Sequence, residues 1–128
     1  MKKVLFVEDD PFIVDIYSSH LRSEGYTVDI AKNLKMAEEK VKSGTPDIVI
    51  LDLNLNPNFP GPKDGLDILR NMRQNPVTKS LKVIVFSNYS LQDYPELSEL
   101  SHLDVAKTLL KVESTPEEMS NTIKELFR

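Results

Sequence analysis

The sequence contains no cysteine among its 128 residues. This absence excludes disulfides, thiolate metal sites and cysteine nucleophiles. No apolar run approaches the length that crosses a bilayer, so no membrane span is predicted. The first residues are basic, but the apolar segment after them stops at Glu8, which is too short for a secretory signal. Together these absences favour a cytoplasmic protein.

The chain also lacks a block of basic residues. Its 16 lysines and arginines are outnumbered by 20 aspartates and glutamates, for a net charge of −4. Nucleic acid is therefore not an evident direct partner. With 40% hydrophobic and 28% charged residues, the composition is that of a globular domain large enough to bury a full core. We expect a single domain over residues 1–128.

Apolar runs and helical patterns alternate along the chain. Strands are expected at residues 3–7, 26–31, 47–51, 82–86 and 105–110. Helices are expected between them and at the end, with caps or starts at Asp10-Pro11, Asn33, Asp64, Pro95 and Thr115-Pro116. Five such strand-helix units predict an α/β, flavodoxin-like, doubly wound parallel sheet, and strand order 2-1-3-4-5 brings the acids after the first and third strands together.

Polar side chains follow the expected strands where ligands bind in such a sheet. Glu8 and Asp9 follow the first strand, and Asp52 follows the third. Acids that converge repel one another and need a cation, and oxygen ligands suit Mg²⁺. Ser87 follows the fourth strand and Lys111 the fifth, so a hydroxyl and an ammonium would face the acids. A carboxylate neutralised by a metal is a plausible nucleophile toward phosphorus, and the five residues together predict an aspartyl-phosphate site.

Each of these residues also has a simpler interpretation. Asp52 alone fits a strand-end cap, Ser87 a turn residue and Lys111 a solvated lysine. For Asp10 the simpler role, capping the first helix, is preferred, whereas for Asp9 metal binding is preferred.

Three other residues receive no assigned chemical role. His20 and His102 are not placed near a strand end with ligand spacing, and we expect them at the surface or partly packed. Phe59 lies between prolines in a long loop, where a binding anchor and a local hydrophobic plug are equally favoured.

The joint order of several segments resembles the response-regulator receiver domain over nearly the whole chain. The segments are VLFVEDD (4–10), DIVILDLNL (47–55), DGL (64–66), VIVFS (83–87) and Lys111. The resemblance implies that Asp52 is the phosphoacceptor, that Ser87 is the switch hydroxyl and that Lys111 pairs with the phosphate. It implies a Mg²⁺ site formed by Asp9, Asp52, Glu8 acting through water and the backbone carbonyl of Asn54.

The sequence departs from that family at several positions. The loop from Asp52 to Gly65 is longer than usual, with its proline one place late at Pro57. Asn88 stands where a small residue is usual, and its bulk is expected to slow access to the acyl phosphate. Thr108 replaces the usual aromatic switch residue, and Val112 replaces the proline that usually follows the lysine.

Three functions are compatible with these patterns. The first is a phosphorylation switch, not an enzyme on other substrates, that receives its phosphoryl group from a histidine kinase or phosphotransfer protein and contacts a downstream protein as a monomer or weak dimer. The second, a phosphohydrolase, is disfavoured because Asn54 replaces the second acid that such enzymes carry. The third is an interaction module that no longer depends on phosphorylation. The chain is either a stand-alone domain or a piece of a longer protein, and Met1 at the first strand favours the former.

Overall fold

The computed structural model describes residues 2–55, 58, 61–90 and 92–128, so the expected roles of Phe59 and the position of Pro57 lie outside the described residues. Five parallel strands form one sheet in the order β2-β1-β3-β4-β5, which confirms the predicted order. The strands are β1 (Lys3–Val7), β2 (Thr27–Ala31), β3 (Ile48–Leu51), β4 (Lys82–Ser87) and β5 (Lys107–Leu110).

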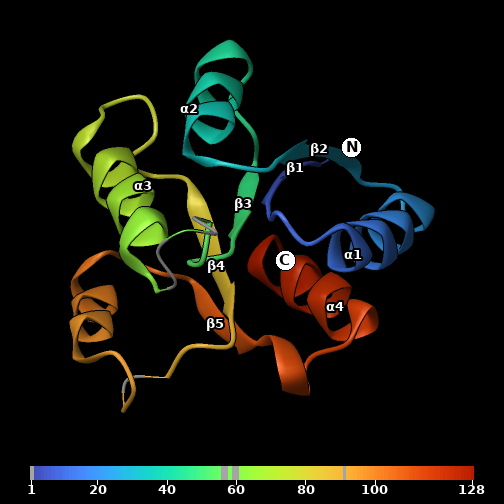
Figure 1. The fold of residues 1–128 in the computed structure, drawn as a ribbon. Coiled ribbons are helices and arrows are strands. Elements are labelled where there is room, and N and C mark those ends of the chain that lie inside the picture. The colour runs from blue at the N-terminus through green and yellow to red at the C-terminus, as the bar shows by residue number, and fades with distance from the viewer. Residues whose placement is uncertain (1, 56–57, 59–60, 91) are drawn as a thin grey trace.

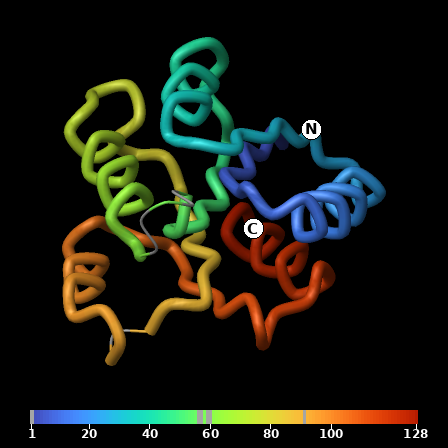
Figure 2. Tube along the Cα trace, in the orientation of Figure 1, coloured from blue at the N-terminus to red at the C-terminus, as the bar shows by residue number. Residues whose placement is uncertain are grey.

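Helices cover both faces of this sheet (Figure 1). On one face lie α1 (Pro11–Ser23) and α4 (Pro116–Leu126). On the other lie α2 (Leu34–Ser43), α3 (Lys63–Gln74) and the 3₁₀ helix η1 (Pro95–His102). The helices α1 and α4 are in contact with each other on the first of these faces (Figure 2). No helix in the described residues is long and apolar enough to span a membrane.

The central strands are buried on both faces, as expected for a parallel sheet covered by helices. Alternate residues of β1, β3 and β4 pack toward α2 and α3, and the residues between them pack toward α1 and α4. Tyr17 of α1 contacts the ring of Phe86 on β4, with the ring centroids 4.9 Å apart. These contacts fix α1 against the sheet directly after the acidic end of β1.

Three of the predicted helix caps are confirmed. Asp10 accepts hydrogen bonds at the start of α1, Asn33 at the start of α2 and Thr115 at the start of α4. The predicted cap at Asp64 is wrong, because α3 begins at Lys63 and Asp64 lies within its first turn. The Leu53 carbonyl accepts from the Gly65 N–H at 3.2 Å, so a backbone oxygen serves this helix end.

Other differences concern the edges of elements. The expected fourth helix forms where predicted, but as a 3₁₀ helix. The last strand begins at Lys107 instead of residue 105, and Asp104 just before it adopts a left-handed backbone with φ of 53°. Phe12 and Ile16, which share the helical spacing of α1, are 78% and 54% exposed. Periodicity alone therefore overstates the buried face of α1.

Candidate functional site

The acidic residues are brought together by the pairing of β1 with β3. Val7 and Leu51 are partners in the parallel register, so the residues that follow them, Glu8 and Asp52, leave the sheet side by side. Their backbones are still held by the sheet, because the Asp52 N–H donates to the Val7 carbonyl and the Glu8 N–H donates to the Ala31 carbonyl, each at 2.9 Å.

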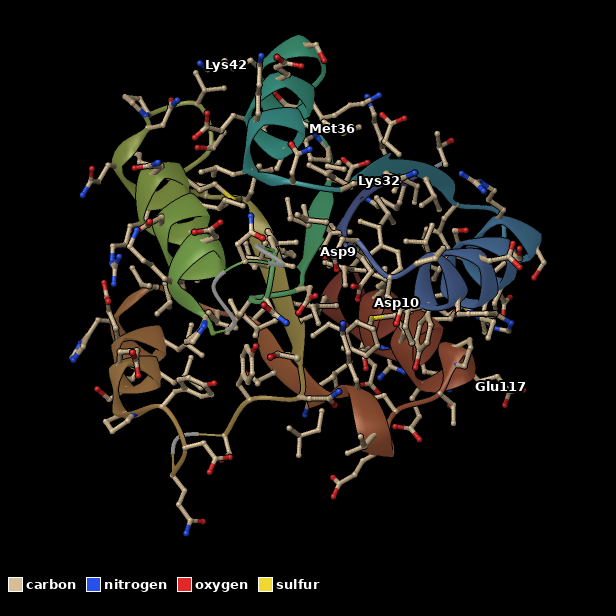
Figure 3. All side chains as sticks on the ribbon, viewed as in Figure 1. Asp9, Asp10, Lys32, Met36, Lys42 and Glu117 are labelled. Carbon is tan, nitrogen blue, oxygen red and sulfur yellow. The ribbon has the colours of Figure 1, made fainter. Side chains whose placement is uncertain are left out.

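Glu8, Asp9 and Asp52 form one cluster of carboxylates. One oxygen from each lies within 4.8 Å of the others. Glu8 is completely buried and Asp52 is 3% exposed, whereas Asp9 is exposed. Asp9 and Asp10 lie where the chain passes from β1 into α1 (Figure 3). The predicted convergence of the acids is therefore present in the fold.

Lys111 provides the positive charge that faces these acids. Its Nζ lies 2.5 Å from Glu8 Oε1 and 3.1 Å from Asp52 Oδ2. The side chain is 13% exposed, and its ammonium lies 5.6 Å from the centroid of the Phe86 ring. A partly buried ammonium between two buried carboxylates offsets part of the cost of removing those charges from water.

Backbone N–H groups bind the remaining oxygens of the two buried acids. Glu8 Oε2 accepts from Asp9 N at 3.1 Å and from Asp10 N at 3.2 Å. Asp52 Oδ1 accepts from Asn54 N at 3.1 Å. Asp10 itself accepts from Phe12 N at 2.9 Å, so its side chain caps α1, as the sequence predicted.

Burial and crowding alter the protonation of the cluster. Burial, and then the negative charge of Asp52, raise the pKa of Glu8 from 4.5 to about 7, although Lys111 opposes the change. Burial also raises the pKa of Asp52, against the opposing effects of Lys111 and of the Asn54 N–H. Burial alone would lower the pKa of Lys111, but the charges of Asp52 and Glu8 outweigh it and raise it. The acids are therefore poised to gain from a further cation.

A cavity of about 310 Å³ opens over the cluster, and the ends of β4 and β5 supply its other side. Its lining residues come from four strand ends and are Glu8, Asp9, Asp10, Asp52, Asn54, Ser87, Asn88, Tyr89 and Lys111. Ser87 is 3% exposed, and its Oγ accepts from the Tyr89 N–H at 3.1 Å. The cavity therefore has acids on one side and a hydroxyl and an ammonium on the other.

The donor set fits a hard divalent cation. All three carboxylates offer oxygen, which such cations prefer. Asn54 Oδ1, at the same cavity, is buried and has no hydrogen-bond partner within the described part of the chain. An orphan acceptor beside three acids is the arrangement that a hydrated cation would complete.

Sequence reasoning missed two features of the cavity rim. Tyr89 accepts a hydrogen bond through its hydroxyl from the Gly61 N–H at 2.9 Å, which ties the long loop to the end of β4. Asn88 Oδ1 accepts from the Val112 N–H at 3.1 Å. No periodic pattern announces either bond, although both Asn88 and Val112 stand out as departures from the family.

The other singled-out residues lie away from the cavity. His20 is on α1, 3.5 Å from Glu24, and His102 is exposed at the end of η1. Thr108, at the position of the usual aromatic switch residue, is exposed on the edge strand β5. None of the three lines the cavity that holds Asp52.

Comparison with known proteins gives the family to which this fold and site belong. A family model for the response regulator receiver domain matches residues 4–124. The chain therefore belongs to the response regulator receiver domain family, which serves two-component signal transduction.

Curated relatives agree with this assignment. The chain is 41% identical over 78 residues to the response regulator ArlR of Staphylococcus saprophyticus, covering 61% of this chain and 33% of that protein. It is 33% identical over 82 residues to the transcriptional regulatory protein BasR of Escherichia coli, covering 64% and 35%. The chain thus spans about a third of the length of the curated relatives it matches.

Solved structures agree with the fold. A CheY-like receiver domain protein from Methanospirillum hungatei superposes with a TM-score of 0.82 at 24% identity, covering 98% of this chain and 93% of that one. A response regulator from Chloroflexus aurantiacus superposes with a TM-score of 0.81 at 26% identity, covering 99% and 98%.

Proposed function

We propose that this domain is a phosphorylation switch in which Asp52 accepts a phosphoryl group from a histidine kinase or phosphotransfer protein. The observation that carries the proposal is the buried Asp52 carboxylate, 3.1 Å from Lys111 Nζ and beside two further acids, in a cavity that Ser87 also lines. A pair of acids and a lysine around one carboxylate is costly to maintain for stability alone.

The transfer itself needs few parts. A carboxylate oxygen of Asp52 attacks the phosphorus, and the bond between phosphorus and the donor's leaving group breaks, with its electron pair departing on that group. The product is an acyl phosphate on Asp52. Lys111 and Ser87 then bind the transferred oxygens, the first by charge and the second by donating its hydroxyl hydrogen. The chain acts on its own Asp52, so it is not an enzyme for other substrates.

Glu8, Asp9, Asp52 and the backbone carbonyl of Asn54 would hold a Mg²⁺ ion in this proposal. When bound, the ion neutralises the acids and the incoming phosphoryl charge. The donor chemistry and the orphan Asn54 Oδ1 support this. A response regulator described as Mn²⁺-bound, Rcp1, shares the fold with a TM-score of 0.80 at 22% identity, over 99% of this chain and 94% of that one.

The same proposal includes output by contact with a downstream protein. It also includes a cytoplasmic location, a monomeric or weakly dimeric state, and a single domain over residues 1–128. No basic block marks a direct nucleic-acid surface on this domain. The phosphorylated and free forms would shift an equilibrium between two surface arrangements.

A second function, an interaction module that no longer depends on phosphorylation, is favoured by one observation. Thr108 is exposed on β5, so the described site has no aromatic side chain at the position that usually reports the state of Ser87. Under this alternative the acid cluster would persist without controlling output.

Incubation with Mg²⁺ and acetyl phosphate, followed by intact-protein mass measurement, tests the proposal. The wild type is expected to gain one phosphoryl group, and Asp52→Asn is expected to gain none. Asp15→Asn, which removes an exposed carboxylate from α1, is the matched control and is expected to behave as the wild type. No gain by the wild type, with unchanged biological output in Asp52→Asn, would favour the interaction module.

A further inference from the structure

A side chain joins the chain segments that follow β4 and β5. Asn88 Oδ1 accepts a hydrogen bond from the backbone N–H of Val112 at 3.1 Å. Asn88 comes directly after Ser87, and Val112 comes directly after Lys111. Ser87 and Leu110 are the last partners of the β4–β5 register. The hydrogen bond, which we call the Asn88–Val112 clasp, therefore continues the connection beyond the end of the sheet.

Burial does not hold Val112 in place. Its side chain is 79% exposed, and it lies in the single 3₁₀ turn η2 (Lys111–Glu113). That turn is closed by Ser114, whose N–H donates to the Lys111 carbonyl at 3.3 Å and whose hydroxyl donates to the Leu110 carbonyl at 2.6 Å. Short 3₁₀ turns are weakly held by their own hydrogen bonds. The clasp is what ties this turn to the neighbouring strand end.

Lys111 needs such an anchor because its chemistry depends on position. Its ammonium stands 2.5 Å from Glu8 Oε1 and 3.1 Å from Asp52 Oδ2, at the end of a flexible four-carbon stem. On its N-terminal side the backbone of Lys111 is fixed by β5, which pairs with β4. On its C-terminal side the clasp fixes the next residue. Small displacements of a group that stabilises charge in a transition state cost rate.

We propose that Asn88 is a positioning residue for Lys111 in the transfer of a phosphoryl group to Asp52. The inference rests on the proposed function. The inference also explains together why positions 88 and 112 both differ from the family. A small residue such as alanine at position 88 would offer no side-chain acceptor, and a proline at position 112 would offer no backbone N–H. Asn88 and Val112, two of the residues that differ from the family, are the two partners of the clasp.

The alternative is that Asn88 acts by bulk. It lines the cavity over Asp52, so its side chain can obstruct the phosphodonor. The two explanations predict opposite results for a small residue. Loss of the clasp slows phosphorylation, whereas loss of bulk accelerates it.

Two variants separate these explanations. Asn88→Leu has nearly the same shape but no carboxamide oxygen, and Asn88→Ala lacks both bulk and acceptor. The test is the rate of phosphorylation of each variant by acetyl phosphate at saturating Mg²⁺, with circular dichroism as the check on folding. Both variants are expected to react about threefold to tenfold more slowly than the wild type, the range that corresponds to one hydrogen bond. Their affinity for Mg²⁺ is expected to stay within about twofold, because the metal ligands come from β1, β3 and the residues after them.

The effect must pass through Lys111 if Asn88 only positions it. In a Lys111→Met background, which keeps a long side chain without the charge, Asn88→Leu is expected to cause no further loss of rate. A general structural effect of Asn88 would lower the rate in that background as well. The double variant therefore distinguishes positioning from loss of local order.

Three results would overturn the inference. They are an Asn88→Ala variant that is faster than the wild type, an unchanged rate in Asn88→Leu, and an equal slowing by Asn88→Leu in the Lys111→Met background. A wild type that takes no phosphoryl group would instead overturn the proposed function. In that case hydrogen exchange at the Val112 amide tests the clasp itself. Slow exchange in the wild type that becomes about tenfold faster in Asn88→Leu supports the clasp. Equal exchange rates in the two proteins overturn the clasp.

Discussion

Replacing Glu8 with glutamine is expected to stabilise the folded chain at neutral and higher pH, although it removes a partner of Lys111. Glu8 is fully buried, and burial together with the charge of Asp52 raises its pKa from 4.5 to about 7 even against the opposing effect of Lys111. Glutamine has nearly the same shape and no charge to bury. The substitution therefore removes an electrostatic cost that the wild type bears once Glu8 ionises.

The sign and size follow from linkage. A folded-state pKa above the unfolded value means that the folded chain binds the proton more tightly. The stabilisation from that proton is complete below pH 4.5 and is lost as the pH rises through about 7. A rise of the Glu8 pKa from 4.5 to about 7 corresponds to roughly 3 kcal/mol of folding free energy. Glu8 and Asp52 share one ammonium, so the full value is not expected. We expect the free energy of unfolding of Glu8→Gln to exceed that of the wild type by about 1 to 3 kcal/mol at about pH 8, and to equal it at about pH 4.

Urea unfolding followed by circular dichroism, across this pH range and with a chelator present, measures the difference. Glu39→Gln, which removes an exposed carboxylate from α2, controls for net charge. The stabilities of wild type and Glu8→Gln are expected to separate between about pH 4.5 and pH 7. The reasoning would be refuted if the free energies of unfolding of the two proteins changed in parallel with pH, or if Glu8→Gln were the less stable protein at about pH 8. Either result would show that the buried carboxylates are not under electrostatic strain.

Two further substitutions test how the site is supported. In Gly65→Ala the new Cβ would lie 2.4 Å from Leu53 Cα and 3.0 Å from the Leu53 carbonyl oxygen. We therefore expect the free energy of unfolding in urea to fall by about 1 to 3 kcal/mol. An unchanged urea midpoint would contradict this close approach. Tyr89→Phe removes the acceptor for the Gly61 N–H but keeps the ring that packs on Tyr94, so the Gly61 amide is expected to exchange faster at a cost of about 1 kcal/mol or less, and unchanged exchange would contradict the bond.

The sequence by itself determined the parts that depend on near neighbours. A four-residue apolar run such as Ile48–Leu51 is typical of a strand that is buried on both faces. The caps Asp10 and Asn33 act on amides two or three residues away. Once the strands are placed, the acids at their ends must meet at one edge of the sheet. The grouping of Glu8, Asp9 and Asp52 was therefore predictable, whereas their chemical roles stay a prediction.

The tertiary structure alone decided what depends on the path of loops. Asn88 meets Val112 across 24 residues of sequence and Tyr89 meets Gly61 across 28, and neither pair belongs to a repeating pattern. Likewise, Asp64 lies within the first turn of α3 and does not cap it, and the Leu53 carbonyl accepts from the Gly65 N–H in that turn. The periodicity of apolar residues in the sequence indicates which side of a helix or strand is buried. A hydrogen bond between two irregular segments forms only after tertiary packing has fixed the position of both segments.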